Sequence, residues 1–476
     1  MRTLLKNASV FTRDGFIRHD ILICDSHVSF DISENEYSAD TVYDLNGLLI
    51  IPGLCDVHVH LREPGFSYKE TIKTGTEAAA HGGYTAVCAM PNLSPVPSTP
   101  ENLKIEQDII DRDALVHVYP FGSITMERKG SGALSMMEAL APKVCGFSDD
   151  GTGVQEESVM RQAMVEAARL GRVISAHCED NRELRPGGCI HDGEYARLYN
   201  HVGINSASEW KQVERDVKLA EETGVHYHVC HVSTKESVEI IREAKKRGVH
   251  VTCETGLHYL MFTDMDLKES GDWKMNPPIR DASDRHALLE GIKDGTIDCI
   301  ITDHAPHSAE EKAKGLDKSA FGIVGLETCF AAMYQNLVLH DPEHPDQANA
   351  YSLPEASHMS EPDEDSGARR ADGQQEDSTT GSERGNHGVI TLGKLIELMC
   401  VKPRRVFGLP GPQYIEDGCV ADLSVVDLGK QWIVDPDKFY SMGKSTLFKG
   451  MKLQGEIVKT FVSGREAYDR ERGIIN

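Results

Sequence analysis

The stretch Asp56-Val57-His58-Val59-His60-Leu61-Arg62 contains residues whose types and spacing could do chemistry. Its alternation of Val and His predicts a β-strand, in which residues two apart point to the same face. His58 and His60 would therefore project side by side, and two imidazoles on one strand face make half of a divalent-metal site. A lone His-x-His pair is more often two half-exposed histidines on an edge strand. A metal site therefore requires further ligands from distant parts of the chain.

Polar residues of the required types follow five other apolar, strand-like segments. They are Asn92, the pair Asp149-Asp150, His177, His231, and Asp303 with His307. For a single segment, the simpler interpretation is a polar side chain that is hydrogen-bonded near a loop. Five segments with such residues at the same end favour one shared site. These imidazoles and carboxylates would bind two divalent metals, with zinc favoured and manganese or cobalt as alternatives. Two close metals can bridge a hydroxide and polarise a substrate oxygen, which is hydrolytic chemistry.

The elements that must position these residues alternate between strand and helix from Gly53 onward. Helical periodicity lies between most of the strands, and glycine often follows a helix where a left-handed cap is favoured. Eight strands alternating with helices predict an α/β fold, a (β/α)₈ TIM-type barrel with its active site at the C-terminal ends of the strands. The third and fourth strands are the weakest of the eight. The predicted strands are 53–60, 84–90, 114–121, 143–148, 172–177, 226–232, 249–254 and 297–303.

Both ends of the chain show short strand-like runs separated by turn residues. We therefore expect a small flanking β domain built from residues 1–50 and 413–476, with the barrel at 51–412. Residues 341–388 contain twelve Asp and Glu, three Arg, no Lys and few large apolar side chains. Such a segment cannot bury enough surface to offset its ordering entropy, so we expect a disordered acidic insert. A docking segment is the alternative, and a tolerated loop is the simpler hypothesis.

Composition limits the compartment and the partners. The formal net charge of -25 argues against nucleic acid or an anionic membrane as partner. The mean hydropathy is -0.36, no apolar run approaches membrane-spanning length, and the N-terminus carries no signal-peptide pattern, so a soluble globular protein is expected. The twelve cysteines form no Cys-x-x-Cys pair, and several lie in apolar runs. A reducing cytoplasm is therefore the expected location.

Longer motifs surround the candidate residues. They are Asp56-Val57-His58-Val59-His60-Leu61-Arg62-Glu63-Pro64-Gly65, Met90-Pro91-Asn92, Phe147-Ser148-Asp149-Asp150-Gly151, His228-Val229-Cys230-His231-Val232-Ser233-Thr234, Met275-Asn276-Pro277-Pro278-Ile279-Arg280, Thr302-Asp303-His304-Ala305-Pro306-His307 and Phe321-Gly322-Ile323-Val324-Gly325-Leu326-Glu327-Thr328. Together they make the chain similar to the dihydroorotases of the amidohydrolase superfamily, specifically the longer bacterial type, over nearly its whole length except the acidic insert. The resemblance implies reversible hydrolysis of (S)-dihydroorotate to N-carbamoyl-L-aspartate by a metal-bridged hydroxide, run in reverse as the ring-closing step of pyrimidine biosynthesis.

The resemblance also implies a role for each matching residue. Two divalent metal ions, expected to be zinc, would be bound by His58 and His60, by His177 and His231, by Asp150 as the bridging carboxylate, and by Asp303. Asp303 would also be the general base, while spacing alone leaves Asp149 open as the bridge. Substrate contacts are implied for His60, Arg62, Asn92, Asn276, His307, Phe321 and Gly322. A homodimer and an association with a transcarbamoylase are the partner arrangements that we consider beyond the small-molecule substrate.

Two alternatives compete with this interpretation. The first is another cyclic amidohydrolase, a dihydropyrimidinase, hydantoinase or allantoinase. Arg62 argues against it, because its planar guanidinium suits the carboxylate that dihydroorotate carries and a plain dihydropyrimidine lacks. Relatives that bridge their metals with a carboxylated lysine would need that lysine on the fourth strand, where Lys143 lies too early. The second alternative is a non-catalytic dihydroorotase-like scaffold for a transcarbamoylase, which would be free to lose ligands, whereas all six are present.

Overall fold

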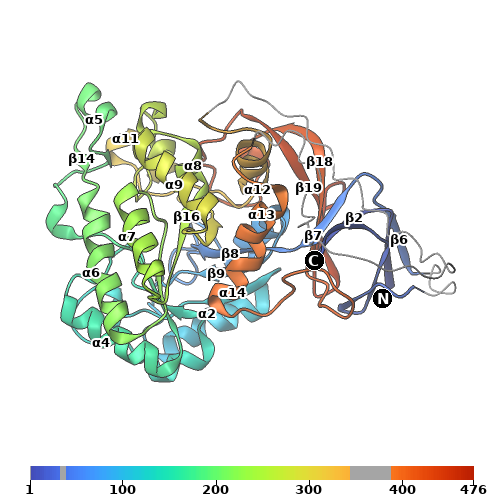
Figure 1. Cartoon of the computed structure of the whole chain (residues 1–476), viewed down its shortest axis with the longest axis horizontal. Coiled ribbons are helices and arrows are strands. Elements are labelled where there is room, and N and C mark those ends of the chain that lie inside the picture. Colours follow the sequence, from blue (N-terminus) through green and yellow to red (C-terminus); the bar gives the residue numbers. More distant parts are fainter. Residues whose placement is uncertain (1, 33–38, 344–387, 476) are drawn as a thin grey trace, which may run out of the picture.

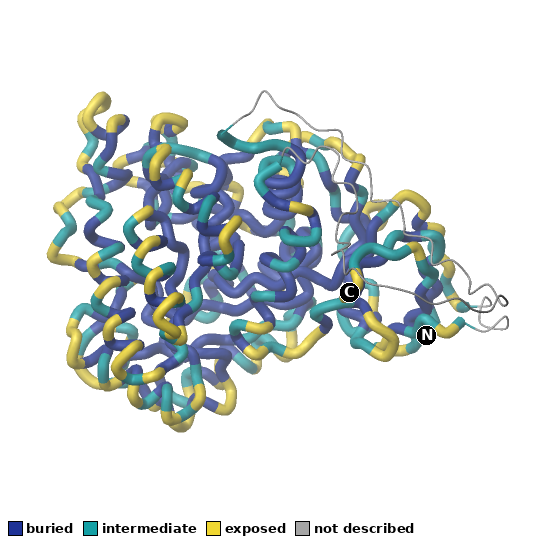
Figure 2. Tube along the Cα trace, in the orientation of Figure 1, coloured by how far each residue is buried: buried dark blue, intermediate teal, exposed yellow. Residues whose placement is uncertain are grey.

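A computed structural model describes residues 2–32, 39–343 and 388–475 of the chain. Figure 1 shows two parts, a barrel of strands surrounded by helices and, beside it, an assembly of β-strands that contains both termini. The buried residues follow the same division, since the strands in the middle of the barrel are buried while the outer sides of its helices are exposed (Figure 2). One buried cluster, which includes Leu5, Ile21 and Val425, lies within the β assembly, while the largest cluster continues from the barrel into the sheet of β7, β18 and β19.

Eight parallel strands form the barrel. β8, β9 and β10 pair in one sheet and β11, β12, β15, β16 and β17 in another, while isolated parallel bridges at Gly122–Phe147 and Val59–His304 link the two sheets at both edges. This arrangement confirms the predicted (β/α)₈ barrel. The strands are β8 (Leu54–Val59), β9 (Tyr84–Ala89), β10 (His117–Pro120), β11 (Gly146–Phe147), β12 (Val173–Ala176), β15 (Tyr227–Val229), β16 (Val251–Gly256) and β17 (Cys299–Ile301).

The third and fourth barrel strands are short, with four residues in β10 and two in β11. β11 ends early because the segment that follows it is bonded to a neighbouring loop. Ser148 donates its backbone N–H to Gly122 O, and the Asp149 carboxylate accepts the backbone N–H groups of Ile124 and Thr125. This geometry turns the chain at the point where the predicted carboxylate ligand lies.

Helices cover the outside of the barrel (Figure 1). α4 and α6 end at Gly171 and Gly224, whose φ angles of 63° and 70° form the left-handed caps that glycine accommodates without strain. The helices are α1 (Ile72–His81), α2 (Pro100–Asp113), α3 (Met137–Leu140), α4 (Glu157–Leu170), α5 (Glu194–Tyr199), α6 (Ala207–Thr223), α7 (Lys235–Lys246), α8 (Leu257–Met261), α9 (Ala282–Asp294), α10 (Ala309–Lys312), α11 (Gly315–Lys318), α12 (Cys329–Met333), α13 (Leu392–Ile396) and α14 (Lys402–Phe407).

The β assembly joins strands from both ends of the chain. One sheet has the order β21-β20-β19-β18-β7-β2-β3, in which β7 and β18 pair antiparallel, and a second sheet has the order β5-β4-β1-β6. We propose that residues 1–50 and 413–476 act as one domain. Its strands are β1 (Arg2–Lys6), β2 (Ser9–Thr12), β3 (Gly15–Arg18), β4 (Ile21–Cys24), β5 (His27–Ser29), β6 (Thr41–Asp44), β7 (Leu49–Pro52), β18 (Leu423–Ile433), β19 (Lys452–Val462), β20 (Arg465–Asp469) and β21 (Gly473–Ile474).

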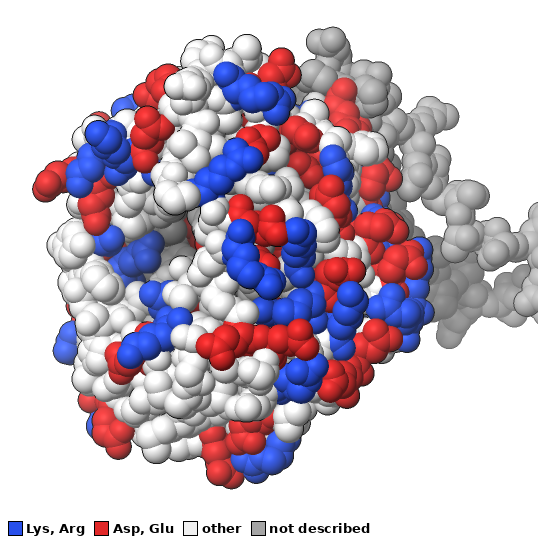
Figure 3. Space-filling view, turned by 90° about the vertical axis from the view of Figure 1, so that its left-hand side faces the viewer, with Lys and Arg blue, Asp and Glu red and all other residues white. Residues whose placement is uncertain are grey.

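Two further expectations concern the insert and the membrane, and the surface charge can be described beside them. The predicted acidic insert falls almost entirely on residues 344–387, which lie outside the described residues. Within the described part of the chain, no helix combines the length and apolar character needed to cross a membrane. On the face seen in Figure 3, Lys and Arg side chains are interspersed with Asp and Glu. The net negative charge is therefore not gathered into one acidic field on that face.

The close approach of α1 to the segment before α12 can be tested by substitution of Gly82. Gly82 caps α1, and a Cβ atom at this position would lie 2.2 Å from the backbone oxygen of Leu326. Because a backbone atom cannot move aside cheaply, Gly82→Ala should lower the free energy of unfolding by about 1–3 kcal/mol and lower the midpoint of thermal unfolding.

The matched control is Gly393→Ala in α13. A Cβ atom at Gly393 meets only Phe11 Cε2, at 3.7 Å, which is an ordinary contact. Alanine also favours a helix over glycine by about 1 kcal/mol, so this variant should unfold at or above the wild-type temperature. A Gly82→Ala protein that is as stable as Gly393→Ala would contradict the close approach.

Candidate metal centre and active site

The C-terminal ends of the barrel strands surround one cavity of about 200 Å³. All seven residues predicted to contact substrate line it, as do five of the six predicted metal ligands. The sixth, His58, is fully buried and contacts Asp150. The barrel thus brings together the residues that the sequence singled out. The lining comprises His60, Arg62, Asn92, Asp150, Gly151, His177, His231, Asn276, Asp303, Ala305, His307, Phe321 and Gly322.

Four imidazoles converge on the buried carboxylate of Asp150. Its Oδ1 lies 3.4 Å from His58 Nε2, 3.6 Å from His231 Nε2 and 3.7 Å from His177 Nδ1. Its Oδ2 lies 3.7 Å from His60 Nε2. Burial alone would raise the pKa of Asp150, but the adjacent imidazoles lower it well below its usual range. The carboxylate therefore has one oxygen directed at three imidazoles and the other directed at the fourth.

The structure separates the two aspartates that spacing left open. Asp149 accepts hydrogen bonds from the backbone N–H groups of Ile124 and Thr125 and from the Thr125 hydroxyl. Its carboxylate therefore anchors the loop after β10, whereas the carboxylate of Asp150 faces the four imidazoles. Of the two, Asp150 is the one that lies among the predicted metal ligands.

The donor set fits divalent metal ions. His58 Nε2, Asp150 Oδ1 and His177 Nε2 are buried and have no hydrogen-bond partner among the described residues. Burying such an atom without a partner costs about 1–3 kcal/mol, so a ligand for these atoms is expected. The groups His58–His60–Asp303 and His58–Asp150–His231 each offer three ligand atoms within 4.8 Å of one another. Imidazole nitrogen and carboxylate oxygen are the donors that zinc and similar metals accept.

Asp303 lies beside the histidines of β8. Its Oδ1 is 3.1 Å from His60 Nε2 and 3.6 Å from His58 Nε2. Burial would raise its pKa, but the hydrogen bond with His60 and the nearby imidazoles lower it. At neutral pH the carboxylate is thus ionised and can accept a proton inside the cavity.

Three residues of the site adopt left-handed backbone conformations. The φ angles are 62° at Arg62, 34° at His231 and 47° at Asp303. Residues other than glycine rarely adopt this region, and its cost of about 1–3 kcal/mol is tolerated only where the surrounding structure imposes it. Each of the three follows a barrel strand, so these turns direct side chains from strand ends into the cavity.

Arg62 lines the cavity, and its guanidinium is held in place by contacts with the loop after β17. Its Nε donates to Pro306 O at 3.2 Å, and its guanidinium lies next to the imidazole of His307. Burial lowers the pKa of Arg62 to about 10, so the group stays charged at neutral pH. His307 is in turn held by Phe321 O at 2.7 Å and by Lys69 Nζ at 3.2 Å. A fixed guanidinium of this kind suits a carboxylate ligand.

Phe321 and Gly322 belong to a loop held by a buried lysine. Lys312 Nζ donates to the backbone oxygens of Lys274, Ala320 and Gly322 at 3.1, 2.9 and 2.7 Å. Gly322 has a φ of 130°, and a Cβ atom there would lie 2.7 Å from Ala305, so only glycine fits. Lys312 therefore ties this loop to the segment that carries Asn276. The sequence motifs do not include Lys312, so they gave no indication of this role.

Glu254 on β16 was also missed, although it contacts a predicted metal ligand. Its Oε1 lies 2.6 Å from His58 Nδ1, and its Oε2 lies 3.1 Å from His228 Nε2. A proton on His58 Nδ1 satisfies the first contact and leaves Nε2 free to coordinate. Burial would lower the pKa of His58, but the carboxylates of Glu254 and Asp150 raise it well above its usual value. The sequence feature that could have indicated this role is the position of Glu254, a carboxylate within the apolar run of the seventh predicted strand.

Comparisons with known proteins identify the family. A family model described as "Dihydro-orotase-like" matches residues 47–237. The dihydroorotase of Enterococcus faecalis is 43% identical over 99% of this chain and 100% of that protein, and the dihydroorotase of Fusobacterium nucleatum is 42% identical over 98% and 99%. The L-hydantoinase of Arthrobacter aurescens, 24% identical, shares the fold with a TM-score of 0.79 over 100% of this chain and 97% of that one. The chain belongs to the dihydroorotase family.

Proposed function

We infer that this chain is a dihydroorotase, a metal-dependent cyclic amide hydrolase that interconverts (S)-dihydroorotate and N-carbamoyl-L-aspartate in pyrimidine biosynthesis. Its similarity to named dihydroorotases over their full length supports this activity. The single observation that carries the substrate class is the position of Arg62. Its buried guanidinium lines the same cavity as the His and Asp cluster, where it can pair with the carboxylate of dihydroorotate.

The family and the His/Asp clusters support divalent metal binding. We propose two ions per chain, most simply zinc, bound by His58, His60, Asp150, His177, His231 and Asp303. Metal ions at these residues would lower the pKa of water and polarise a carbonyl oxygen. Asp150, which contacts all four imidazoles, is the proposed bridging ligand.

The residues of the chain supply binding and proton transfer. Arg62 binds the substrate carboxylate, while Asn92, Asn276, His307 and the Phe321–Gly322 loop confine the ring. Asp303 accepts a proton from the attacking water and passes it to the departing amide nitrogen, as a general base and then a general acid. The small, fixed cavity orients the reacting carbonyl toward the His and Asp cluster.

The lysine-bridged amidohydrolases are the nearest alternative in chemistry. Lys143 ends a short 3₁₀ helix before β11 and is exposed, so it lies at the opposite end of that strand from Asp150. This position argues against Lys143 as a bridge and favours the carboxylate. The alternative of a scaffold without catalysis is disfavoured by the buried, unpartnered ligand atoms, which a protein without metal would have no reason to retain.

Compartment and assembly are further proposals. All twelve cysteines are free thiols, and ten of them are buried, which fits a reducing cytoplasm. A homodimer and an association with a transcarbamoylase stay predictions from the family resemblance.

Removal of the guanidinium tests the substrate assignment. Arg62→Met keeps a long side chain but leaves the substrate carboxylate without its partner. It should reduce kcat/KM for dihydroorotate by about 100-fold or more, because a charged hydrogen-bonded partner in a buried site contributes roughly 3 kcal/mol. Metal content, measured on the same sample by mass spectrometry, should equal that of wild type.

The control is Arg112→Met on the exposed surface of α2, which should retain full activity. Dihydrouracil serves as a second substrate for all three proteins. Wild-type turnover of dihydrouracil that matches turnover of dihydroorotate, or full activity of Arg62→Met, would show that Arg62 does not select the substrate.

Replacement of Glu254 tests the support of His58. Glu254→Gln removes the negative charge from the contact with His58 Nδ1 while preserving the size of the side chain. Loss of such a partner weakens metal binding by about 10–100-fold, and chelator competition should detect this change. Glu239→Gln on the exposed side of α7 should bind metal as wild type does. Equal affinity in both variants would exclude a role for Glu254 at the metal centre.

A further inference from the structure

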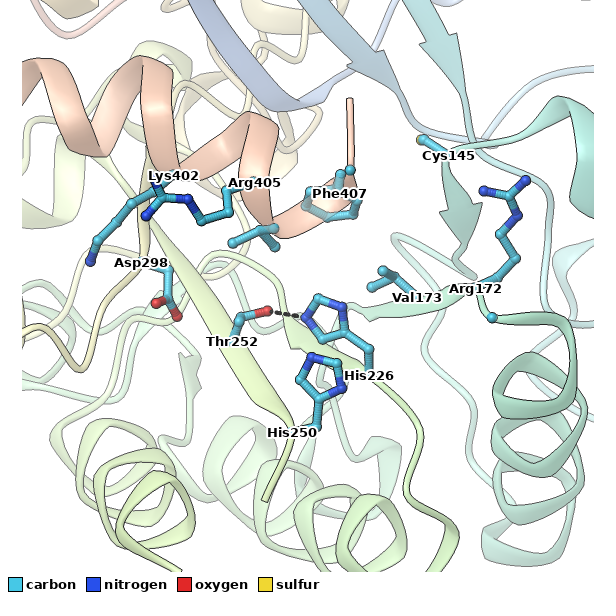
Figure 4. A pocket seen from close by; sticks show the side chains of 13 residues that line it. Cys145, Arg172, Val173, His226, His250, Thr252, Asp298, Lys402, Arg405 and Phe407 are labelled. Atoms are coloured by element: carbon cyan, nitrogen blue, oxygen red, sulfur yellow. Dashed lines mark hydrogen bonds between the residues drawn. The ribbon is translucent and has the colours of Figure 1, made fainter. Parts of the chain in front are cut away.

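A second cavity opens at the other end of the barrel. Its volume is about 630 Å³, within the range of small-molecule binding sites. Four of the residues that line it directly precede barrel strands: Arg172 before β12, His226 before β15, His250 before β16 and Asp298 before β17. The cavity therefore lies at the N-terminal ends of the strands, opposite the predicted active site, and α14 covers one side of it (Figure 4).

The charged lining of this cavity is predominantly basic. Arg172 and Lys402 make no side-chain hydrogen bond or ion pair among the described residues, and Arg172 Nε is buried without a partner. Arg405 donates to Gln413 Oε1 at 3.0 Å, and this partner is an uncharged amide. The one carboxylate of the lining, Asp298, is already neutralised by Lys245 at 2.5 Å. In a chain with a net charge of -25, unpaired cations gathered in one cavity indicate an anionic ligand.

Flat rings lie between the basic groups. Arg172 lies on one side of the cavity and Lys402 with Arg405 on the other, with the imidazoles of His226 and His250 between them (Figure 4). These two rings are stacked, with centroids 4.1 Å apart and an interplanar angle of 9°. Burial lowers the pKa of His226 to about 3, so its ring is uncharged at neutral pH. His250 is exposed, and its outer face can stack against a planar ligand.

We propose that this cavity binds a nucleotide-sized organic phosphate. The phosphate would pair with Lys402 and Arg405 on one side of the cavity, Arg172 on the opposite side would add to the positive charge, and a planar base would stack on the exposed face of His250. This site is separate from the proposed active site, since the two cavities have no lining residue in common. Its occupancy is therefore independent of whether the chain hydrolyses dihydroorotate.

Calorimetric titration of the full-length, metal-loaded protein with uridine 5′-monophosphate tests the proposal. One saturable site per chain is expected. The double variant Arg172→Gln with Lys402→Gln should weaken this binding about tenfold or more, because charge-assisted hydrogen bonds are lost. The double variant Lys104→Gln with Lys218→Gln changes the net charge equally at exposed positions, and it should bind as wild type does.

Two further variants show whether the nucleotide binds in this cavity or in the active site. Arg62→Met should bind uridine 5′-monophosphate unchanged, whereas loss of binding would place the ligand in the active site and overturn the proposal. His250→Ala should weaken binding of the nucleotide but not of inorganic phosphate, as expected for stacking. No saturable binding, equal binding by the Arg172–Lys402 double variant, or no effect of His250→Ala would each overturn it.

Discussion

The crowding of four imidazoles around one buried carboxylate is the constraint on which the rest of the structure depends. Asp150 lies within 3.7 Å of ring nitrogens from β8, from the end of β12 and from the end of β15. Buried atoms of this cluster have no hydrogen-bond partner among the described residues, so the arrangement is costly unless a cation is bound. Only a closed barrel brings the ends of these strands, far apart in sequence, to one point.

The surroundings of the cluster maintain its geometry. Glu254 contacts His58 and His228, and His228 contacts Thr252 at 2.8 Å. Thr252 in turn contacts His226, which lines the second cavity. A continuous series of hydrogen bonds therefore runs through the barrel interior from one end to the other. These bonds restrict how the rings of His58 and His228 can turn, which suits a site that must keep its ligands in place.

The fold and the convergence of the His and Asp residues could be predicted from the sequence because both depend on local patterns, whereas the roles of Asn276, Phe321 and Gly322 came only from the family resemblance. Strand–helix alternation predicts the barrel, and the rule that residues two apart share a strand face brings His58 and His60 together. Spacing alone left Asp149 and Asp150 open as the bridge, because the local pattern does not show that Asp149 bonds to the loop of Ile124 and Thr125 while Asp150 faces the imidazoles.

Glu254, Lys312 and the second cavity could not be predicted from the sequence, because they depend on contacts between distant segments of the chain. Glu254 contacts His58, which lies 196 positions away in the sequence. Lys312 donates to the backbone oxygens of two separate segments, at Lys274 and at Gly322. These contacts depend on the register of neighbouring strands and on the conformation of the loops. Neither can be deduced from residues that are adjacent in a single sequence. The second cavity is likewise invisible in the sequence, because its lining comes from residues that precede separate strands.

Metal content measured together with turnover on one sample tests the central claim most directly. The protein is purified without chelator, its metal is quantified by mass spectrometry, and ring opening of dihydroorotate is followed before removal, after removal and after restoration of the metal. The account predicts about two divalent ions per chain, with activity that disappears and returns with them. Turnover that persists without metal, or a protein that binds none, would contradict it.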